Sequence, residues 1–238
     1  MTSEMAQPST NRPAARRLPR SQRVAAILQA ARGVLRERGS EQFTTAEVAE
    51  RCGTSEGTIY KYFPTRRDLL VQVAEGWLDE FLAEDFPART SGPIRERLYH
   101  AIWWSLSSIR REPALTRFIL MELRADPGYR KLRIYEQNRE IVSRVMAVIA
   151  DGQASGDFRK TLDMYLVRDM IFGAIEHQTW AYLRGEGNFS VDESASGITE
   201  VVIRGLLTAD AANDPLSGAV ARLERAAERL EAKLDKPD

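Results

Sequence analysis

The chain has 238 residues, with 34 basic and 34 acidic side chains, 43% hydrophobic residues and one cysteine. A single cysteine excludes an internal disulfide framework and any zinc site built from several cysteines, so we expect a reducing, cytoplasmic setting. No segment approaches the roughly 20 apolar residues that a membrane-spanning helix needs, and the polar start lacks the apolar centre of a signal peptide. We therefore expect no membrane partner.

The balanced total charge conceals an uneven distribution along the chain. Residues 1–70 contain 12 basic and 7 acidic side chains, whereas residues 71–238 contain 22 and 27. A basic N-terminal part predicts a polyanion partner there, because binding would release counterions. Residues 1–20 are too poor in apolar side chains to pack alone, so they are expected to be a disordered arm. Its arginines, Arg12, Arg16, Arg17 and Arg20, either enter a DNA minor groove or belong to an uninvolved tail.

Helical periodicity extends over nearly the whole chain, and no strand alternation is evident, so we predict an all-α fold. The first helix is expected to begin at Ser21, as its N-cap, and to end at Gly39. A second, two-turn helix should follow Thr44 and extend to about Cys52. Glu47 stands three residues after Thr44, the spacing of a capping box.

A glycine turn at residues 53–55 separates this helix from a third one, over Glu56 to about Phe63. Glycine accepts the left-handed conformation that a tight turn needs. Pro64 ends the third helix, and Thr65 can cap a fourth. Two short helices joined by a glycine turn and packed on a longer first helix form a helix-turn-helix, so residues 21–70 are predicted to be a three-helix DNA-binding domain.

The third helix has the dimensions and the side chains for DNA recognition. Its roughly eight residues span about 12 Å, which fits the major groove. Ile59 and Phe63 lie four residues apart and should face the core. Glu56 would repel phosphates but can accept a hydrogen bond from cytosine, so base recognition and a structural role both remain open. The predicted DNA-binding residues are Thr44, Thr45, Ser55, Glu56, Gly57, Thr58, Tyr60, Lys61, Tyr62 and Arg66, of which Tyr60, Lys61, Tyr62 and Arg66 suit phosphates.

Residues 44–70, TTAEVAERCGTSEGTIYKYFPTRRDLL, resemble the DNA-binding signature of the TetR/AcrR family of transcriptional regulators. Three positions depart from the usual pattern: Thr54, Glu56 and Arg66. The resemblance implies a homodimer that binds a palindromic double-stranded operator through its N-terminal domains. It also implies C-terminal helical domains that dimerise and bind a small-molecule effector. Most members of the family are repressors.

Residues 71–212 are predicted to be this larger ligand-binding and dimerisation domain. Apolar residues recur at helical spacing over 93–111, 114–124, 129–151, 161–184 and 198–207, with a loop over 152–160. The helix over 161–184 is apolar on much of its circumference, which indicates burial on more than one side. We expect it to form the dimer interface with 198–207, and ordinary packing within one chain is the alternative.

An effector pocket is expected among the middle helices of this domain. The predicted ligand-binding residues are Tyr99, Trp103, Phe118, Met121, Arg124, Phe172, His177 and Trp180, although large aromatic side chains more often fill cores. Residues 121–124, 156–159 and 171–175 resemble acyl-CoA-responsive regulators of fatty-acid metabolism within the same family. That resemblance implies a long amphiphilic effector, with basic residues near its phosphates, either Arg124 or Arg159. An aromatic or drug-like compound, with a role in efflux, is the alternative.

The sequence contains no pattern typical of an enzyme. It lacks a phosphate-binding loop, a dinucleotide-binding glycine motif and a His-Glu-x-x-His motif, and its two histidines are 77 positions apart. We therefore predict no catalytic residues, no metal and no cofactor. A DNA-binding architectural protein without an effector is the rival class, and the large apolar domain argues against it.

The C-terminal segment, residues 213–238, is predicted to be a charged helix or tail. Its apolar residues are spaced 3, 4, 3 and 4 apart, at Val220, Leu223, Ala227, Leu230 and Leu234. This heptad pattern is short for an independent coiled coil. Pairing with a second subunit, packing on its own subunit and partial order all remain open.

Overall fold

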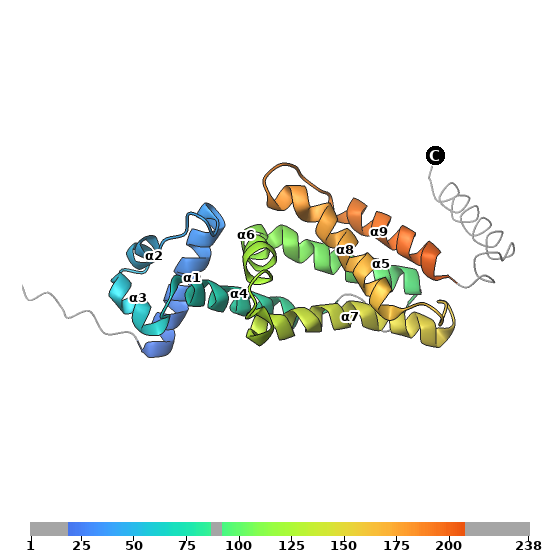
Figure 1. Ribbon diagram of the computed structural model, residues 1–238, viewed down its shortest axis with the longest axis horizontal. Helices are drawn as coiled ribbons and strands as arrows, with labels where there is room; N and C mark the ends of the chain where they lie inside the picture. The colour runs from blue at the N-terminus through green and yellow to red at the C-terminus, as the bar shows by residue number, and fades with distance from the viewer. Residues whose placement is uncertain (1–18, 87–91, 208–238) are drawn as a thin grey trace, which may run out of the picture.

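The computed structural model describes residues 19–86 and 92–207 (Figure 1). Over these residues the chain is helical, and the only strand-like pairing among them is one isolated antiparallel bridge between Phe158 and Leu207. The all-α prediction is therefore confirmed. The predicted tail, and all but the last two residues of the predicted arm, lie outside the described residues.

The N-terminal domain, called the head below, contains α1 (Arg20–Arg38), α2 (Thr45–Arg51), α3 (Glu56–Tyr62) and the start of α4 (Arg66–Ala83). Ser21 is not the N-cap of α1 as predicted, because the helix begins directly after Pro19, whose fixed φ suits a helix start. Thr44 and Ser55 do cap α2 and α3, with hydrogen bonds of 3.3 and 3.2 Å from backbone amides.

The turn geometry of the head follows the predicted helix-turn-helix. Gly53 has a φ of 62°, the left-handed conformation expected for the turn between α2 and α3. Ile59 and Phe63 are buried, as predicted from their spacing. Only half of the predicted capping box at Thr44 forms, because the Glu47 carboxylate binds Arg51 at 2.7 Å instead of the Thr44 amide.

The remaining helices form the body of the molecule. They are α5 (Ile94–Arg111), α6 (Pro113–Arg117), the π-helix η1 (Phe118–Leu123), the 3-10 helix η2 (Tyr129–Lys131), α7 (Arg133–Ser155), α8 (Met164–Leu183) and α9 (Val191–Leu206). The predicted helix over 114–124 thus consists of a short α-helix and a wider π-helical turn. The last helix starts seven residues earlier than predicted, where Ser190 caps it.

Two hydrophobic cores hold these helices together. The first core contains residues of α1, α2, α3 and α4, together with residues of α6, η1 and the start of α7. The second core contains residues of α5, α7, α8 and α9. The predicted domain boundary at residues 70–71 falls inside α4, which continues from the head into the body (Figure 1). The first core also packs the head directly against α6 and η1, so a change at these elements can reach α1 to α3.

Candidate DNA-binding and effector sites

The exposed residues around α3 form the candidate DNA-binding face. Thr44, Ser55, Glu56, Gly57, Tyr60 and Lys61 are exposed, and Thr58 and Tyr62 are half-buried. The N-terminal end of α3 and the start of α2 therefore present polar groups and backbone amides on one side of the head. Such groups can contact phosphates and base edges.

Thr45 lies behind this face, because it is only 6% exposed. Its hydroxyl donates a 2.6 Å hydrogen bond to Glu56 and lies 2.9 Å from the hydroxyl of Tyr60. The side chain of Thr45 is thus used to join α2 to α3. The same contact gives Glu56 a structural role, which the sequence left open.

Arg66 is also engaged within the head. Its guanidinium donates hydrogen bonds to the backbone carbonyls of Ser40 and Phe43, the latter at 3.2 Å, and it lies over the Phe43 ring. These bonds tie the start of α4 to the segment that leads into α2. A local sequence pattern does not reveal such a role, since the partners are carbonyls more than 20 positions away.

A largely apolar pocket lies between α4, α5, α6, η1, α7 and α8, and its empty volume is about 640 Å³ including the space at its mouth. Its apolar lining is formed by Trp77, Leu78, Ile109, Ile119, Leu120, Ile134, Ile141, Phe172 and Ile175. Its polar lining is formed by Ser105, Ser108, Thr116, Arg124, Asn138 and Glu176. An apolar cavity with a few convergent polar groups is the usual form of a small-molecule site.

Two of the eight predicted ligand-binding residues, Arg124 and Phe172, line this pocket, and the other six lie elsewhere. Phe118 is buried in the first core, and Met121 is half-buried outside the lining. The π-helical turn explains this, because it has more residues per turn than an α-helix and so presents Ile119 and Leu120 to the pocket instead. The remaining four lie on other faces of the body: Tyr99 and Trp103 donate hydrogen bonds to Asp192 of α9, and His177 and Trp180 are exposed on α8.

The polar end of the pocket contains an ion pair and an unpaired hydroxyl. Arg124, just after η1, forms a salt bridge with Glu176 of α8. The hydroxyl of Thr116 on α6 is buried and has no hydrogen-bond partner among the described residues. A ligand that carries a hydrogen-bond acceptor would satisfy this hydroxyl, since a buried unpaired polar group costs free energy.

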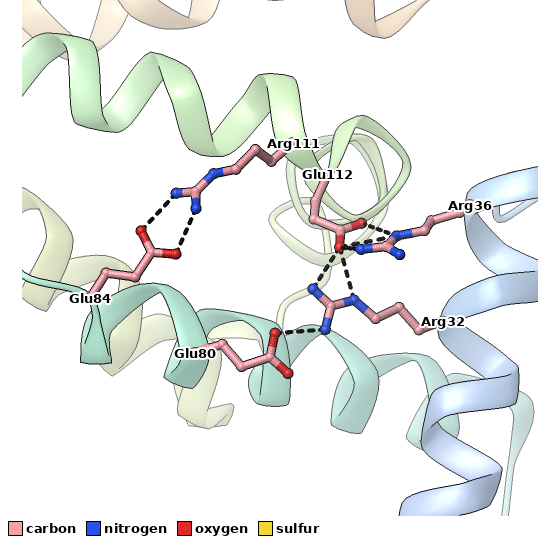
Figure 2. Close-up of polar contacts among 6 residues, drawn as sticks. All are labelled: Arg32, Arg36, Glu80, Glu84, Arg111 and Glu112. Atoms are coloured by element: carbon pink, nitrogen blue, oxygen red, sulfur yellow. Dashed lines mark hydrogen bonds and ion pairs between the residues drawn. The ribbon is translucent and has the colours of Figure 1, made fainter.

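Glu112, which the sequence analysis did not single out, forms the main polar junction between head and body (Figure 2). It lies between α5 and α6 and is only 1% exposed. Arg32 and Arg36 of α1 donate hydrogen bonds to its carboxylate, at 2.8 and 2.9 Å from their Nε atoms. Arg32 also binds Glu80 of α4 at 2.7 Å. The buried carboxylate thus joins α1 to the start of α6, and Arg32 extends the network to α4 through Glu80.

The electrostatics of this junction favour the ionised carboxylate. Burial by itself would raise the pKa of Glu112, but the hydrogen bonds and charges of Arg36 and Arg32 outweigh it, so its pKa is lowered. Thr116 lies one turn along α6, where its backbone amide donates a 2.9 Å hydrogen bond to the Glu112 carbonyl. The short helix α6 therefore contacts both the pocket and the head.

Comparison with known proteins agrees with this architecture. Residues 27–73 match the family model described as bacterial regulatory proteins, tetR family. Residues 91–206 match the model described as tetracyclin repressor-like, C-terminal domain, and the two matches together cover more than half of the chain. The chain belongs to the TetR family. This TetR-family protein is a helix-turn-helix transcriptional regulator, as the signature over residues 44–70 predicted.

Individual relatives are similar over most of the chain. The Fatty acid metabolism regulator protein of Bacillus subtilis is 24% identical over 183 residues, which cover 76% of this chain and 93% of that protein. The HTH-type transcriptional repressor KstR2 of Mycobacterium tuberculosis is 24% identical over 163 residues, which cover 66% of this chain and 78% of the repressor. The crystal structure of FadR from Bacillus subtilis in complex with stearoyl-CoA superposes with a TM-score of 0.65 at 23% identity, and the match covers 76% of this chain and 98% of FadR. These relatives are regulators of transcription.

Two further findings concern the described part of this TetR-family regulator. None of its helices within residues 19–86 and 92–207 is both long enough and apolar enough to cross a membrane. In the same ranges, no three histidine, cysteine or acidic residues are grouped so that they could hold a metal ion.

Proposed function

We propose that this TetR-family regulator is a repressor that binds a palindromic operator as a homodimer and is released by an amphiphilic effector. The observation that carries the proposal is the pocket, because its walls include α4 and α6. Helix α4 begins in the head and α6 packs against it, so a ligand that prefers one position of these helices would change the position of the head. The protein acts by binding rather than by catalysis, in the cytoplasm, where its DNA lies.

DNA recognition is assigned to the exposed face around α3. Lys61 and Tyr60 are placed to contact phosphates, and Thr44 offers backbone amides at the start of α2. Ser55, Gly57, Thr58 and Tyr62 complete the face, and Glu56 is positioned by Thr45 at its edge. Arg66 is assigned a structural role, since carbonyl groups of the head occupy its guanidinium.

Lys61→Ala and Arg66→Ala should therefore have different effects. Lys61→Ala should weaken binding to all DNA sequences alike and reduce the slope of log K against log salt concentration by about 0.9 per lost phosphate contact. Arg66→Ala should instead lower the melting temperature, because two backbone carbonyls lose their donor. Fluorescence anisotropy across a salt series and thermal unfolding measure the two effects. A flatter slope for Arg66→Ala at unchanged stability would contradict the assignment.

Dimerisation is assigned to the outer face of α8 and α9. Leu166 and Met170 of α8 are each 56% exposed, and Val201 of α9 is 67% exposed. The exposed α8 positions Leu166, Met170, Gly173, His177 and Trp180 follow each other at intervals of 4, 3, 4 and 3 residues. Such a series lies along one side of a helix. An apolar stripe of this kind supports burial against the same stripe of a second subunit.

The pocket supports an effector with an apolar body and an anionic or hydrogen-bond-accepting group. The apolar walls would hold the body, and Arg124 and Thr116 would bind the polar group at one end. A structural relative of this chain has been crystallised with stearoyl-CoA, a ligand of this chemistry. Acyl-CoA is therefore the effector class that we favour over an aromatic or drug-like compound.

Titration with stearoyl-CoA tests this proposal. The full chain is bound to a labelled duplex from directly upstream of its own gene, and stearoyl-CoA should release it at fixed salt concentration. Arg124→Ala should require at least about tenfold more ligand, since hydrogen bonds to a charged group contribute about 1.5–3 kcal/mol. Arg139→Ala is the matched control, because Arg139 lies on the surface of α7, where it contacts Glu136 in an exposed ion pair and the ring of Tyr135. DNA binding that persists at saturating stearoyl-CoA would exclude the acyl-CoA class and retain the regulator.

A further inference from the structure

A carboxylate without a cationic partner lies on the face that is assigned to DNA. Glu56 is the first residue of α3, it is exposed, and it forms no ion pair with another residue of 19–86 or 92–207. In a helix-turn-helix, the N-terminal residues of the second helix contact base edges in the major groove. Phosphates repel a carboxylate, so an acidic residue at this position lowers the affinity for DNA unless a base donates a hydrogen bond to it.

A short series of hydrogen bonds positions this carboxylate. The buried hydroxyl of Thr45 lies 2.6 Å from Oε2 of Glu56 and 2.9 Å from the hydroxyl oxygen of Tyr60. A carboxylate only accepts hydrogen bonds, so Thr45 donates its single hydroxyl proton to Glu56. The hydroxyl of Tyr60 must then donate its own proton to Thr45. The donors therefore run from Tyr60 through Thr45 to Glu56, and both hydroxyl protons are used.

The other oxygen of Glu56 is free to accept a hydrogen bond. Within the part of the chain that the structure describes, Oε1 has no hydrogen-bond partner. Because Thr45 already holds the side chain, less conformational entropy is lost when Oε1 contacts a base. Tyr60 can still contact a phosphate through the positive edge of its ring. The start of α3 thus presents a fixed hydrogen-bond acceptor to the major groove.

Cytosine is the base that matches such an acceptor. In the major groove it presents the N4 amino donor and no acceptor of its own. Adenine has its N7 acceptor beside the amino group, guanine presents the N7 and O6 acceptors, and thymine presents the O4 acceptor and a methyl group. Each of these three bases would place an electronegative atom near the carboxylate. A carboxylate at this position therefore selects cytosine and also repels the alternatives.

We propose that Glu56 determines operator specificity by accepting a hydrogen bond from the N4 amino group of one cytosine in each half-site, and that Thr45 positions it. Each oxygen of the carboxylate has its own role, since Oε2 joins α3 to α2 and Oε1 contacts the base. The inference rests on the proposed operator binding and adds a base preference to it. A hydrogen bond to a charged group is strong enough for a preference of at least about tenfold.

Selection of the full chain on duplexes with a random centre tests the inference without a known operator. The wild-type chain should select a palindrome with a cytosine in each half-site that Glu56→Gln no longer prefers. The glutamine oxygen can still accept from Thr45, and its amide then donates toward the base. The preference should therefore move to adenine, guanine or thymine, which present acceptors. Thr45→Val should keep cytosine with a weaker preference, because the carboxylate is no longer held.

Glu50→Gln is the matched control for this selection. It removes the same charge from an exposed position of α2, and no side-chain hydrogen bond of Glu50 is found within residues 19–86 and 92–207. The cytosine preference should be unchanged in this variant. Loss of the preference in both Glu50→Gln and Glu56→Gln would show an effect of charge alone and overturn the inference.

A second measurement uses the wild-type chain and so does not depend on the folding of a variant. The selected cytosine is replaced in both half-sites by the analogue that lacks the 4-amino group, and fluorescence anisotropy at fixed salt concentration measures binding. The affinity should fall at least about tenfold for each half-site. The same replacement at a cytosine outside the selected palindrome is the control and should have no effect.

The outcomes distinguish this inference from the proposed function. If the wild-type chain selects a palindrome and Glu56→Gln selects the same bases at every position, Glu56 has only its structural role and the regulator stands. Unchanged affinity for the duplex without the 4-amino groups would overturn the inference in the same way. An undiminished preference in Thr45→Val would contradict the positioning by Thr45. If the wild-type chain enriches no sequence, the proposed operator binding fails as well.

Discussion

Glu112→Ala should lower the free energy of unfolding by about 3 kcal/mol, because it removes one partner from a buried ion pair. The Glu112 side chain is 2% exposed, and Arg32 beside it is 22% exposed. Without the carboxylate, both Arg32 and Arg36 lose their main acceptor at the junction of α1 with α6 (Figure 2). We expect a loss of stability at the lower end of the range for a broken buried ion pair, because Arg36 is half exposed and water can solvate it.

The matched control for this variant is Glu84→Ala. Glu84 forms a salt bridge with Arg111 at 2.6 Å near the same junction, but both side chains are more than 40% exposed. An exposed pair of this kind contributes about 0–1 kcal/mol. Urea unfolding of the two variants compares the buried pair with the exposed one. Equal losses of stability in both would contradict the role assigned to Glu112.

The ionisation of Glu112 also makes the free energy of unfolding depend on pH. The pKa of Glu112 is lowered in the folded protein. The stabilisation by its ionised carboxylate is therefore fully present at pH values above the ordinary glutamate pKa of about 4.3. The contribution is lost as the pH falls through the lower folded pKa. Glu112→Ala should therefore lose less stability than the wild-type protein on acidification over this range.

The position of Glu112 also suggests how the pocket is connected to the DNA-binding helices. Glu112 directly precedes α6, and Thr116 at the other end of this five-residue helix lines the pocket. A ligand that binds Thr116 and Arg124 acts on the same helix that the head holds through Arg32 and Arg36. A helix that contacts both sites can couple them if the ligand favours one position of α6 and the DNA-bound head favours another. Loss of Glu112 should therefore also weaken the effect of the effector on DNA affinity.

The parts of this fold that local signals determine could be predicted from the sequence. Thr44 and Ser55 are caps, Gly53 is a turn, and Ile59 and Phe63 share one face, so the helix-turn-helix follows from spacing and side-chain type. These features depend on residues within a few positions of each other.

The parts that distant contacts determine could not be predicted in the same way. Arg66 was assigned to phosphates, and its carbonyl partners become evident only when α4 packs beside the segment before α2. The predicted lining differs at Phe118 and Met121 because residues 118–123 form a π-helical turn, whose register departs from the 3.6-residue period. Four other predicted residues of α5 and α8 lie on faces away from the pocket, and which face of a helix meets a cavity depends on distant packing. Glu112 carries no local signal, since its partners are 76 and 80 positions away.

Met170→Glu should convert the dimer to a monomer over a wide concentration range and reduce operator affinity strongly. Met170 is 56% exposed in the single chain and lies near the centre of the apolar series from Leu166 to Trp180. A carboxylate buried there without a partner costs several kcal/mol, which corresponds to a dissociation constant raised by about 10²–10³-fold. The affinity for the operator falls because a monomer has one head and a palindromic operator has two half-sites. In the dimer, binding of the first head makes binding of the second an intramolecular step, and the monomer loses this gain.

Gln178→Glu provides the matched control, because it places the same carboxylate at an exposed position of α8 outside the series of Leu166, Met170, Gly173, His177 and Trp180. Sedimentation velocity over a concentration series measures the association of both variants, and circular dichroism compares their folding. Because the side chain of Met170 is already exposed in the single chain, its replacement should leave the helical signal unchanged. A Met170→Glu protein that sediments as the wild type does would place the dimer interface on another face. The apolar stripe of α8 would then need a different partner, since an exposed apolar series of this length is costly to leave in water.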